Sequence, residues 1–154
     1  MSEIEKTEQL HHDWRESENE RKMLSDMGYS QKAIEYYIRK PYMTALVDAD
    51  HVSEMTGTCG DTMKISLKIR RGMIEDVGYQ VLGCPGAVAS AMAVVDLIKG
   101  GSLENAGKIN DNDVFKALED MPAKKHHCIQ LSVKTLHKAV DEYRRKESKI
   151  KTIN

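Results

Sequence analysis

The residues best suited to covalent or metal chemistry in this sequence are its three cysteines, Cys59, Cys84 and Cys128. Their odd number and wide spacing argue against a disulfide framework, so we expect free thiols. Thiolates bind soft metal ions and attack sulfur. Each cysteine stands near the predicted end of a helix or strand, outside the middle of any apolar face. The residues alone leave two alternatives open, a metal or redox site and three inert thiols.

Two other side chains offer a fourth ligand beside the three thiols. Asp61 follows Cys59 across Gly60, which lets the chain turn so that both side chains point the same way. A carboxylate matches a soft metal less well than a thiolate, so Asp61 would leave one corner easily displaced. His127 precedes Cys128 directly and offers a nitrogen instead. The sequence leaves the choice between Asp61 and His127 open.

Local charge is expected to favour the thiolate form of two cysteines. Pro85 suits the first position of a helix, which places Cys84 at its N-cap. Cys128 begins the last predicted helix and closely follows Lys125. Helix N-termini and nearby cations stabilise thiolates, so we expect both cysteines to be activated.

A Cys–His hydrolase is a competing use of the same residue types. It would need a histidine beside a cysteine nucleophile. Side chains at adjacent helix positions diverge, which argues against His127 with Cys128. His137 lies more than two helical turns beyond Cys128, which argues against that pair as well. The sequence therefore disfavours a hydrolase.

The elements that must position these residues begin with strands. Residues 63–70 alternate apolar and polar side chains with the period of a half-buried strand. A tight turn at Arg71-Gly72 leads into a strand over 74–82, and residues 51–56 predict a further short strand. The result is an antiparallel meander, with Cys59 in its first turn and Cys84 after its last strand.

Helices are predicted before and after this meander. Residues 87–99 are apolar on nearly all sides and rich in alanine, which indicates a helix buried against the sheet. Helices packed on a three-stranded antiparallel sheet make an α+β domain. The other expected helices run from a Ser30 cap to Arg39 or Lys40, from Ser102 to about 106, from Asp111 or Asn112 to about 120, and from about 127 to about 146.

Composition and charge exclude several classes of function. The chain has 154 residues, 40% of them hydrophobic, which suits one domain with a sizeable core. Lys plus Arg number 23 and Asp plus Glu 24, a formal charge of −1 that gives no reason to expect nucleic acid. The chain starts without an apolar secretory region, and its longest apolar run is too short for a bilayer. We expect a cytoplasmic protein that does not contact membranes.

Three segments are predicted along the chain. Residues 1–28 form an extension with few apolar side chains, expected to be a marginal helix that depends on docking or on a partner. Residues 29–146 form the domain that holds the cysteines. Residues 147–154 are expected to be a basic tail. A homo-oligomer is left open. The apolar residues expected on one face of the extension are Leu10, Trp14 and Leu24.

The segments around the cysteines resemble the iron–sulfur cluster assembly scaffolds of the IscU type, also found as the N-terminal domain of NifU. The resemblance covers roughly residues 29–146 and is most specific in 57–63, 83–90 and 125–128. It implies an IscU/SufE-like fold that holds a [2Fe–2S] cluster or, in its absence, a zinc ion. The ligands it implies are Cys59, Asp61, Cys84 and Cys128.

The resemblance also implies how the cluster is built. A cysteine desulfurase delivers sulfur as a persulfide, and we rank Cys128 before Cys59 as its acceptor, with Lys125 stabilising the charge. Iron then binds, and an external electron donor such as a ferredoxin is needed, because the sequence has no flavin or nicotinamide motif. The cluster passes to apo iron–sulfur acceptor proteins. The protein would be a scaffold and sulfur acceptor with sulfurtransferase-like chemistry, not an enzyme.

Departures from related sequences refine this expectation. SufU-type proteins, which are zinc-dependent sulfur acceptors, carry an insertion between the second and third cysteines and lack the histidine. The short spacing here and the presence of His127 favour the IscU type, and a zinc-binding persulfide relay is the alternative. Residues 121–125 read Met-Pro-Ala-Lys-Lys where the family has Leu-Pro-Pro-Val-Lys. That change argues against a dedicated Hsp70-type chaperone as a partner.

Overall fold

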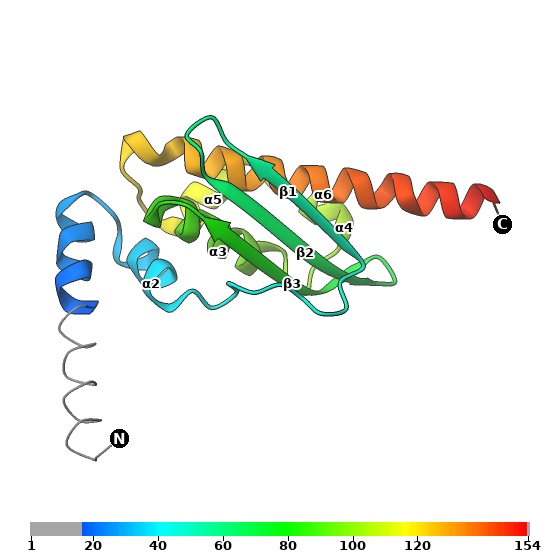
Figure 1. Ribbon diagram of the computed structural model, residues 1–154, viewed down its shortest axis with the longest axis horizontal. Coiled ribbons are helices and arrows are strands. Elements are labelled where there is room, and N and C mark those ends of the chain that lie inside the picture. The colour runs from blue at the N-terminus through cyan, green and yellow to red at the C-terminus, as the bar shows by residue number, and fades with distance from the viewer. Residues whose placement is uncertain (1–16, 154) are drawn as a thin grey trace, which may run out of the picture.

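The computed structural model describes residues 17–153, and its fold is α+β, as predicted. Strands β1 (His51–Thr56), β2 (Thr62–Arg70) and β3 (Met73–Leu82) form an antiparallel sheet in the order β1-β2-β3. Helices α3 (Pro85–Ile98) and α6 (His126–Ile153) pack on one face of this sheet (Figure 1). The other elements are α2 (Gln31–Arg39), α4 (Leu103–Ala106), α5 (Asp111–Leu118) and a 3-10 turn, Ala123–Lys125.

The sheet follows the alternation of the sequence. The predicted Arg71-Gly72 turn joins β2 to β3, and both residues have positive φ, 53° and 76°, as a type I′ hairpin requires. The register pairs Thr62 with Leu82, so β2 begins where β3 ends, at one end of the sheet. The inward-facing residues of β2 are fully buried under the helices: Met63, Ile65 and Leu67.

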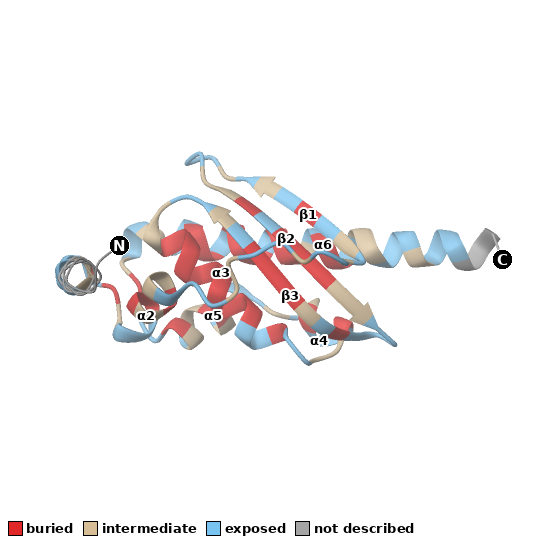
Figure 2. Ribbon diagram, turned by 60° about the horizontal axis from the view of Figure 1, so that its bottom comes forward, coloured by how far each residue is buried: buried red, intermediate tan, exposed pale blue. Residues whose placement is uncertain are grey.

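Helix α3 lies in the centre of the core, where Figure 2 shows an almost unbroken run of buried residues. Its alanines at 87, 89, 91 and 93 are 0% exposed, and such small side chains let the sheet and the neighbouring helices approach closely. The predicted burial of this helix is confirmed. Within the described part of the chain, neither α3 nor any other helix is long and apolar enough to cross a membrane.

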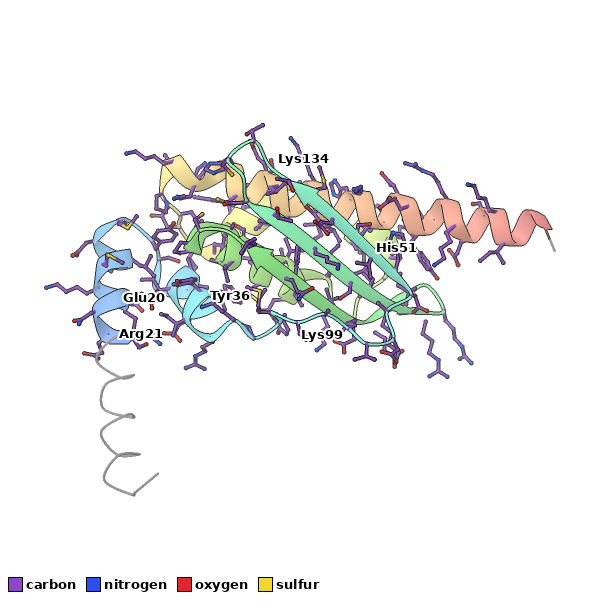
Figure 3. All side chains as sticks on the ribbon, in the orientation of Figure 1. Glu20, Arg21, Tyr36, His51, Lys99 and Lys134 are labelled. Atoms are coloured by element: carbon purple, nitrogen blue, oxygen red, sulfur yellow. The ribbon has the colours of Figure 1, made fainter. Side chains whose placement is uncertain are left out.

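The described part of the N-terminal segment is helical over residues 17–26. Leu24 is 1% exposed and belongs to the core. Arg21 forms an ion pair with Glu35 of α2, and Figure 3 shows Glu20 and Arg21 on the side of the helix that faces α2. Leu24 therefore docks the described part of this segment against the core. The other two apolar residues expected on its face, Leu10 and Trp14, lie outside the described residues.

Two predicted helix boundaries are wrong. Helix α5 is capped by Asn110, not by Asp111 or Asn112, because Asn110 and Asp113 form a reciprocal capping box; the helix then ends at Leu118. Helix α6 does not end near 146 but continues to Ile153, through most of the segment predicted as a tail. Residues 144–151 contain neither Gly nor Pro and are mostly good helix formers, so nothing ends the helix there.

Candidate metal and thiol site

Three ends of secondary-structure elements meet at one end of the sheet and bring five predicted side chains together. The turn between β1 and β2 carries Cys59 and Asp61. The junction between β3 and α3 carries Cys84, and the first turn of α6 carries His127 and Cys128. All three cysteines are free thiols. Their ligand atoms fall into two overlapping groups, which we name by their burial.

The inner group consists of Asp61, Cys84 and Cys128, whose ligand atoms all lie within 4.8 Å of one another. The Cys84 and Cys128 Sγ atoms are 3.5 Å apart. Asp61 Oδ2 accepts a hydrogen bond from Cys84 Sγ at 3.6 Å and lies 4.0 Å from Cys128 Sγ. Cys128 is 1% exposed and Cys84 is half-buried. Two soft ligands and one hard ligand therefore already converge without a metal ion.

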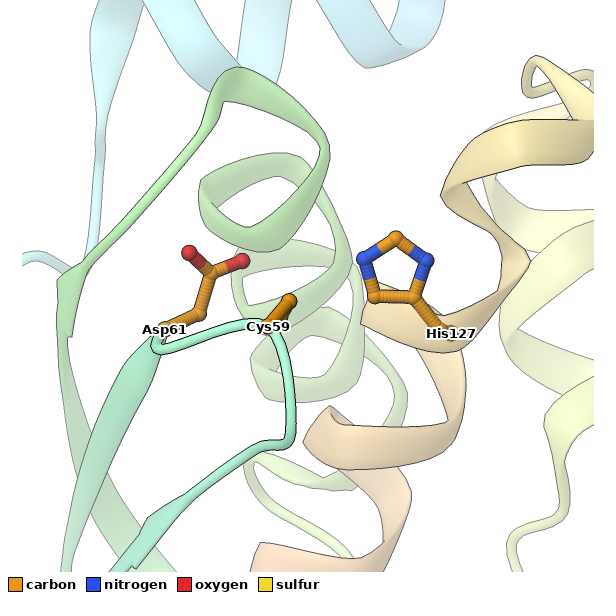
Figure 4. Close-up of side chains that lie close together, drawn as sticks. All are labelled: Cys59, Asp61 and His127. Atoms are coloured by element: carbon orange, nitrogen blue, oxygen red, sulfur yellow. The ribbon is translucent and has the colours of Figure 1, made fainter.

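The outer group consists of Cys59, Asp61 and His127, whose ligand atoms also lie within 4.8 Å of one another. Figure 4 shows Cys59 and Asp61 rising from the turn and the His127 ring reaching toward them from α6. Cys59 and His127 are both exposed and line a pocket of about 190 Å³. Asp61 belongs to both groups, so its carboxylate joins the exposed ligands to the buried ones.

Two glycines allow Asp61 to take this position. Gly60 has φ +91°, a left-handed conformation that glycine adopts without strain, and it aims Cys59 and Asp61 the same way, as predicted. Gly83 lies so close that a Cβ there would stand 2.7 Å from the Asp61 carboxylate. This second contact was not predicted, because it depends on the register between β2 and β3. A signal was nevertheless present in the sequence, in a glycine directly before a candidate ligand.

The two neighbouring thiols of the inner group differ in acidity: the pKa of Cys84 is lowered and that of Cys128 is raised. The pKa of Cys84 is lowered from 9.0 to about 6, mainly because the Cys128 thiol donates a hydrogen bond to it. The Ala87 backbone N–H at the start of α3 and the charge of Lys125 act in the same direction. The expectation that Cys128 is also activated is wrong for the metal-free site. Its pKa is raised, because it donates that hydrogen bond and is buried.

The expected divergence of His127 and Cys128 is also wrong. His127 Nε2 lies 3.6 Å from Cys128 Sγ, although the residues are adjacent in α6. The imidazole is long enough to reach back to the neighbouring thiol across the first turn of the helix. Cys128 is buried, however, and His137 is held away from it by Ile109 O at 2.7 Å. The contact between His127 and Cys128 therefore places a nitrogen ligand beside the thiols. It does not make Cys128 an accessible nucleophile.

Lys125 and Tyr29 form the wall behind the inner group. Lys125 is half-buried, and its Cβ would lie 3.2 Å from a Cβ placed on Gly86 of α3. Tyr29 is 5% exposed, and its hydroxyl has no hydrogen-bond partner among the described residues. Burial, followed by the charges of Cys84 and Cys128, raises the pKa of Tyr29 to about 12. Lys125 was predicted here; Tyr29 was not, because only the folded chain shows that it faces the site.

A small α+β domain with two overlapping sets of thiol, carboxylate and imidazole groups has the ligand types that metal-binding proteins use. This chain belongs to the NifU-like N-terminal domain family, whose model matches residues 28–150. The match includes all five ligands described above and confirms the family suggested by the sequence.

Similar proteins in several organisms carry scaffold names. The chain is 34% identical over 126 residues to iron–sulfur cluster assembly scaffold protein IscU 1 of Archaeoglobus fulgidus, covering 81% of this chain and 82% of that protein. It is also 34% identical over 125 residues to IscU of Escherichia coli, covering 78% and 97%.

The same architecture occurs in solved structures. The N-terminal part of a NifU-like protein from Brucella abortus matches with a TM-score of 0.62 and 19% identity, covering 76% of this chain and 94% of that one. The FiSufU protein of Fervidobacterium islandicum AW-1 matches with a TM-score of 0.60 and 21% identity, covering 73% and 96%. These similarities establish the fold.

Proposed function

We propose that this protein is a scaffold on which a [2Fe–2S] cluster is assembled and from which it is passed to apo iron–sulfur acceptor proteins. The observation that carries the proposal is the pair of ligand groups joined by Asp61. One iron ion suits the thiolates of the inner group, and a second suits Cys59 with Asp61 or His127. The cluster is cargo, so an exposed and weakly held corner is useful for its release.

Sulfur enters as a persulfide from a cysteine desulfurase. Cys59 is exposed and open to a donor thiol, whereas Cys128 is 1% exposed. Our ranking of Cys128 ahead of Cys59 stays a prediction, and the exposure of Cys59 supports the second choice. Lys125 stabilises negative charge at the inner sulfurs. An external electron donor such as a ferredoxin completes the chemistry.

The test is anaerobic reconstitution with ferrous iron, a cysteine desulfurase and cysteine. The scaffold should turn brown, absorb in the visible range and hold iron and sulfide in equal amounts. A colourless protein that binds one zinc ion tightly would favour the zinc-dependent persulfide relay. Asp61→Ala should hold its cluster longer and transfer it more slowly to an apo-acceptor. Asp48→Ala, which removes an exposed carboxylate that forms an ion pair with Lys68, is the matched control.

A further inference from the structure

The contact between Cys84 and Cys128 has chemical consequences beyond metal binding. The two sulfurs lie 3.5 Å apart, and a disulfide requires about 2.05 Å, so a movement of roughly 1.5 Å joins them. The printed partners of Cys84 Sγ are Cys128 Sγ and Asp61 Oδ2, so the side chain already points at the second sulfur. The remaining cysteine of the chain, Cys59, belongs to the outer group. The inner pair is therefore the pair of thiols poised for disulfide formation.

A scaffold that receives persulfide must reduce it. The outer sulfur of a persulfide is at the oxidation level of elemental sulfur and needs two electrons to become sulfide. Two neighbouring thiols hold those two electrons, because their oxidation to a disulfide releases them. We propose that Cys84 and Cys128 act as a dithiol that releases sulfide from a persulfide carried on either of them, and so become a disulfide. This inference rests on the proposed function.

The step balances without another reagent. With the persulfide on Cys128, the Cys84 sulfur attacks the inner sulfur of Cys128. The bond between inner and outer sulfur breaks, and the outer sulfur leaves with the bonding electron pair as hydrosulfide. The bond that forms is the Cys84–Cys128 disulfide. When Cys84 attacks from its thiol form, Asp61 Oδ2, at 3.6 Å, takes the proton.

The surroundings of the pair support this order of events. Cys128 is buried, so small thiols from solvent reach it poorly and its neighbour Cys84 is the reductant at hand. The disulfide removes two metal ligands, so sulfide release precedes the binding of iron at the inner group. The external electron donor then acts on the Cys84–Cys128 disulfide and restores both ligands.

The experiment uses the full-length, reduced, metal-free protein under anaerobic conditions. A cysteine desulfurase and limiting cysteine charge it with persulfide, the enzyme is removed, and the protein is held with a chelator and without reductant. Sulfide is measured over time, and disulfides are mapped by peptide mass spectrometry. We expect about one sulfide per persulfide together with the Cys84–Cys128 disulfide. In Cys84→Ser, release should slow about tenfold or more, with persulfide retained on Cys128.

Two results would overturn the inference. One is persulfide that persists on the unaltered protein, on any cysteine. The other is sulfide release accompanied by a disulfide that includes Cys59 or a second chain. The same persulfide-charged sample, given ferrous iron and dithiothreitol, tests the proposed function separately. If a cluster forms in this second assay but the first assay yields no Cys84–Cys128 disulfide, the dithiol step is wrong. The scaffold function would still stand.

Discussion

The inner and outer ligand groups differ in what surrounds them, although they share Asp61. Cys84 and Cys128 lie against the core, under Lys125 and Tyr29, and contact each other directly. Cys59 and His127 stand at the surface beside a pocket. Burial protects a bound ion from water and holds its ligands in place, whereas exposure gives partners access. The comparison teaches that one small site can divide its tasks: buried ligands suit holding a cluster, and exposed ligands suit receiving and releasing its parts.

The largest expected effect comes from breaking the inner group. Cys128→Ala leaves Cys84 and Asp61 as the only inner ligands, and we expect zinc affinity to fall about a hundredfold or more. Cys59→Ala leaves the inner group complete and should weaken binding only about tenfold. Competition with a chromophoric chelator measures both affinities, and thermal unfolding checks that each variant folds. Equal losses in the two variants would contradict the division into two groups.

The next largest effect on zinc binding should come from displacing Asp61, which belongs to both the inner and the outer group. Gly83→Ala places a Cβ 2.7 Å from the Asp61 carboxylate, so Asp61 must shift away from both groups. We expect a loss of about 1–2 kcal/mol in the free energy of unfolding and clearly weaker zinc binding. Gly101→Ala is the matched control, because a Cβ there would lie 3.4 Å from Ile98 O. The idea is wrong if the two variants bind zinc alike.

The activation of Cys84 predicts a distinct pH dependence. Because its pKa in the metal-free protein is about 6, alkylation of Cys84 by iodoacetamide should be half-maximal near pH 6. The rate should decline as pH falls below that value, since the thiolate is the nucleophile. Peptide mass spectrometry follows Cys84 separately from the other cysteines. Half-maximal alkylation above pH 8 would show that Cys128 does not stabilise the thiolate.

Lys125 should have a smaller influence on the same profile. Its charge is the weakest of the factors that shift the pKa of Cys84. Lys125→Gln should therefore move the alkylation profile slightly upward in pH. Lys124→Gln removes an exposed charge next to it and should leave the profile in place. A shift of the same size in both variants would show only a general charge effect.

The smallest expected effect concerns the wall of the inner group. Tyr29→Phe removes a buried hydroxyl that has no partner among the described residues, so the free energy of unfolding should change by less than about 1 kcal/mol. Tyr79→Phe is the comparison, because the Tyr79 hydroxyl donates to Ser132 O at 2.8 Å. Losing that bond should cost about 1–2 kcal/mol. Chemical denaturation measures the free energy of unfolding of both variants. A larger loss in Tyr29→Phe than in Tyr79→Phe would be inconsistent with the described contacts.

Local sequence signals predicted most of the fold because they act within a few residues. The Arg71-Gly72 turn, the Ser30 cap and the apolar α3 were all predicted correctly. The helix boundaries near Asn110 and Lys146 were not. In the first case a capping box moved the helix start by one residue, and in the second nothing in the sequence stops the helix.

The site was predictable in membership but not in its internal arrangement. Residue type and the family resemblance pointed to Cys59, Asp61, Cys84, Cys128 and His127. The division into an inner and an outer group depends on burial, and the activation of Cys84 at the expense of Cys128 depends on one contact between distant residues. The same holds for the approach of Gly83 to Asp61 and for Tyr29. Such features arise only when strands and helices pack.

The most direct measurement is a Mössbauer spectrum of the protein reconstituted with ⁵⁷Fe under anaerobic conditions. The account predicts two iron sites in equal amounts with different parameters. One should be held by the inner thiolates, and the other by Cys59 with an oxygen or nitrogen ligand. A single kind of mononuclear iron, or two identical sites, would contradict a cluster that spans an inner and an outer group.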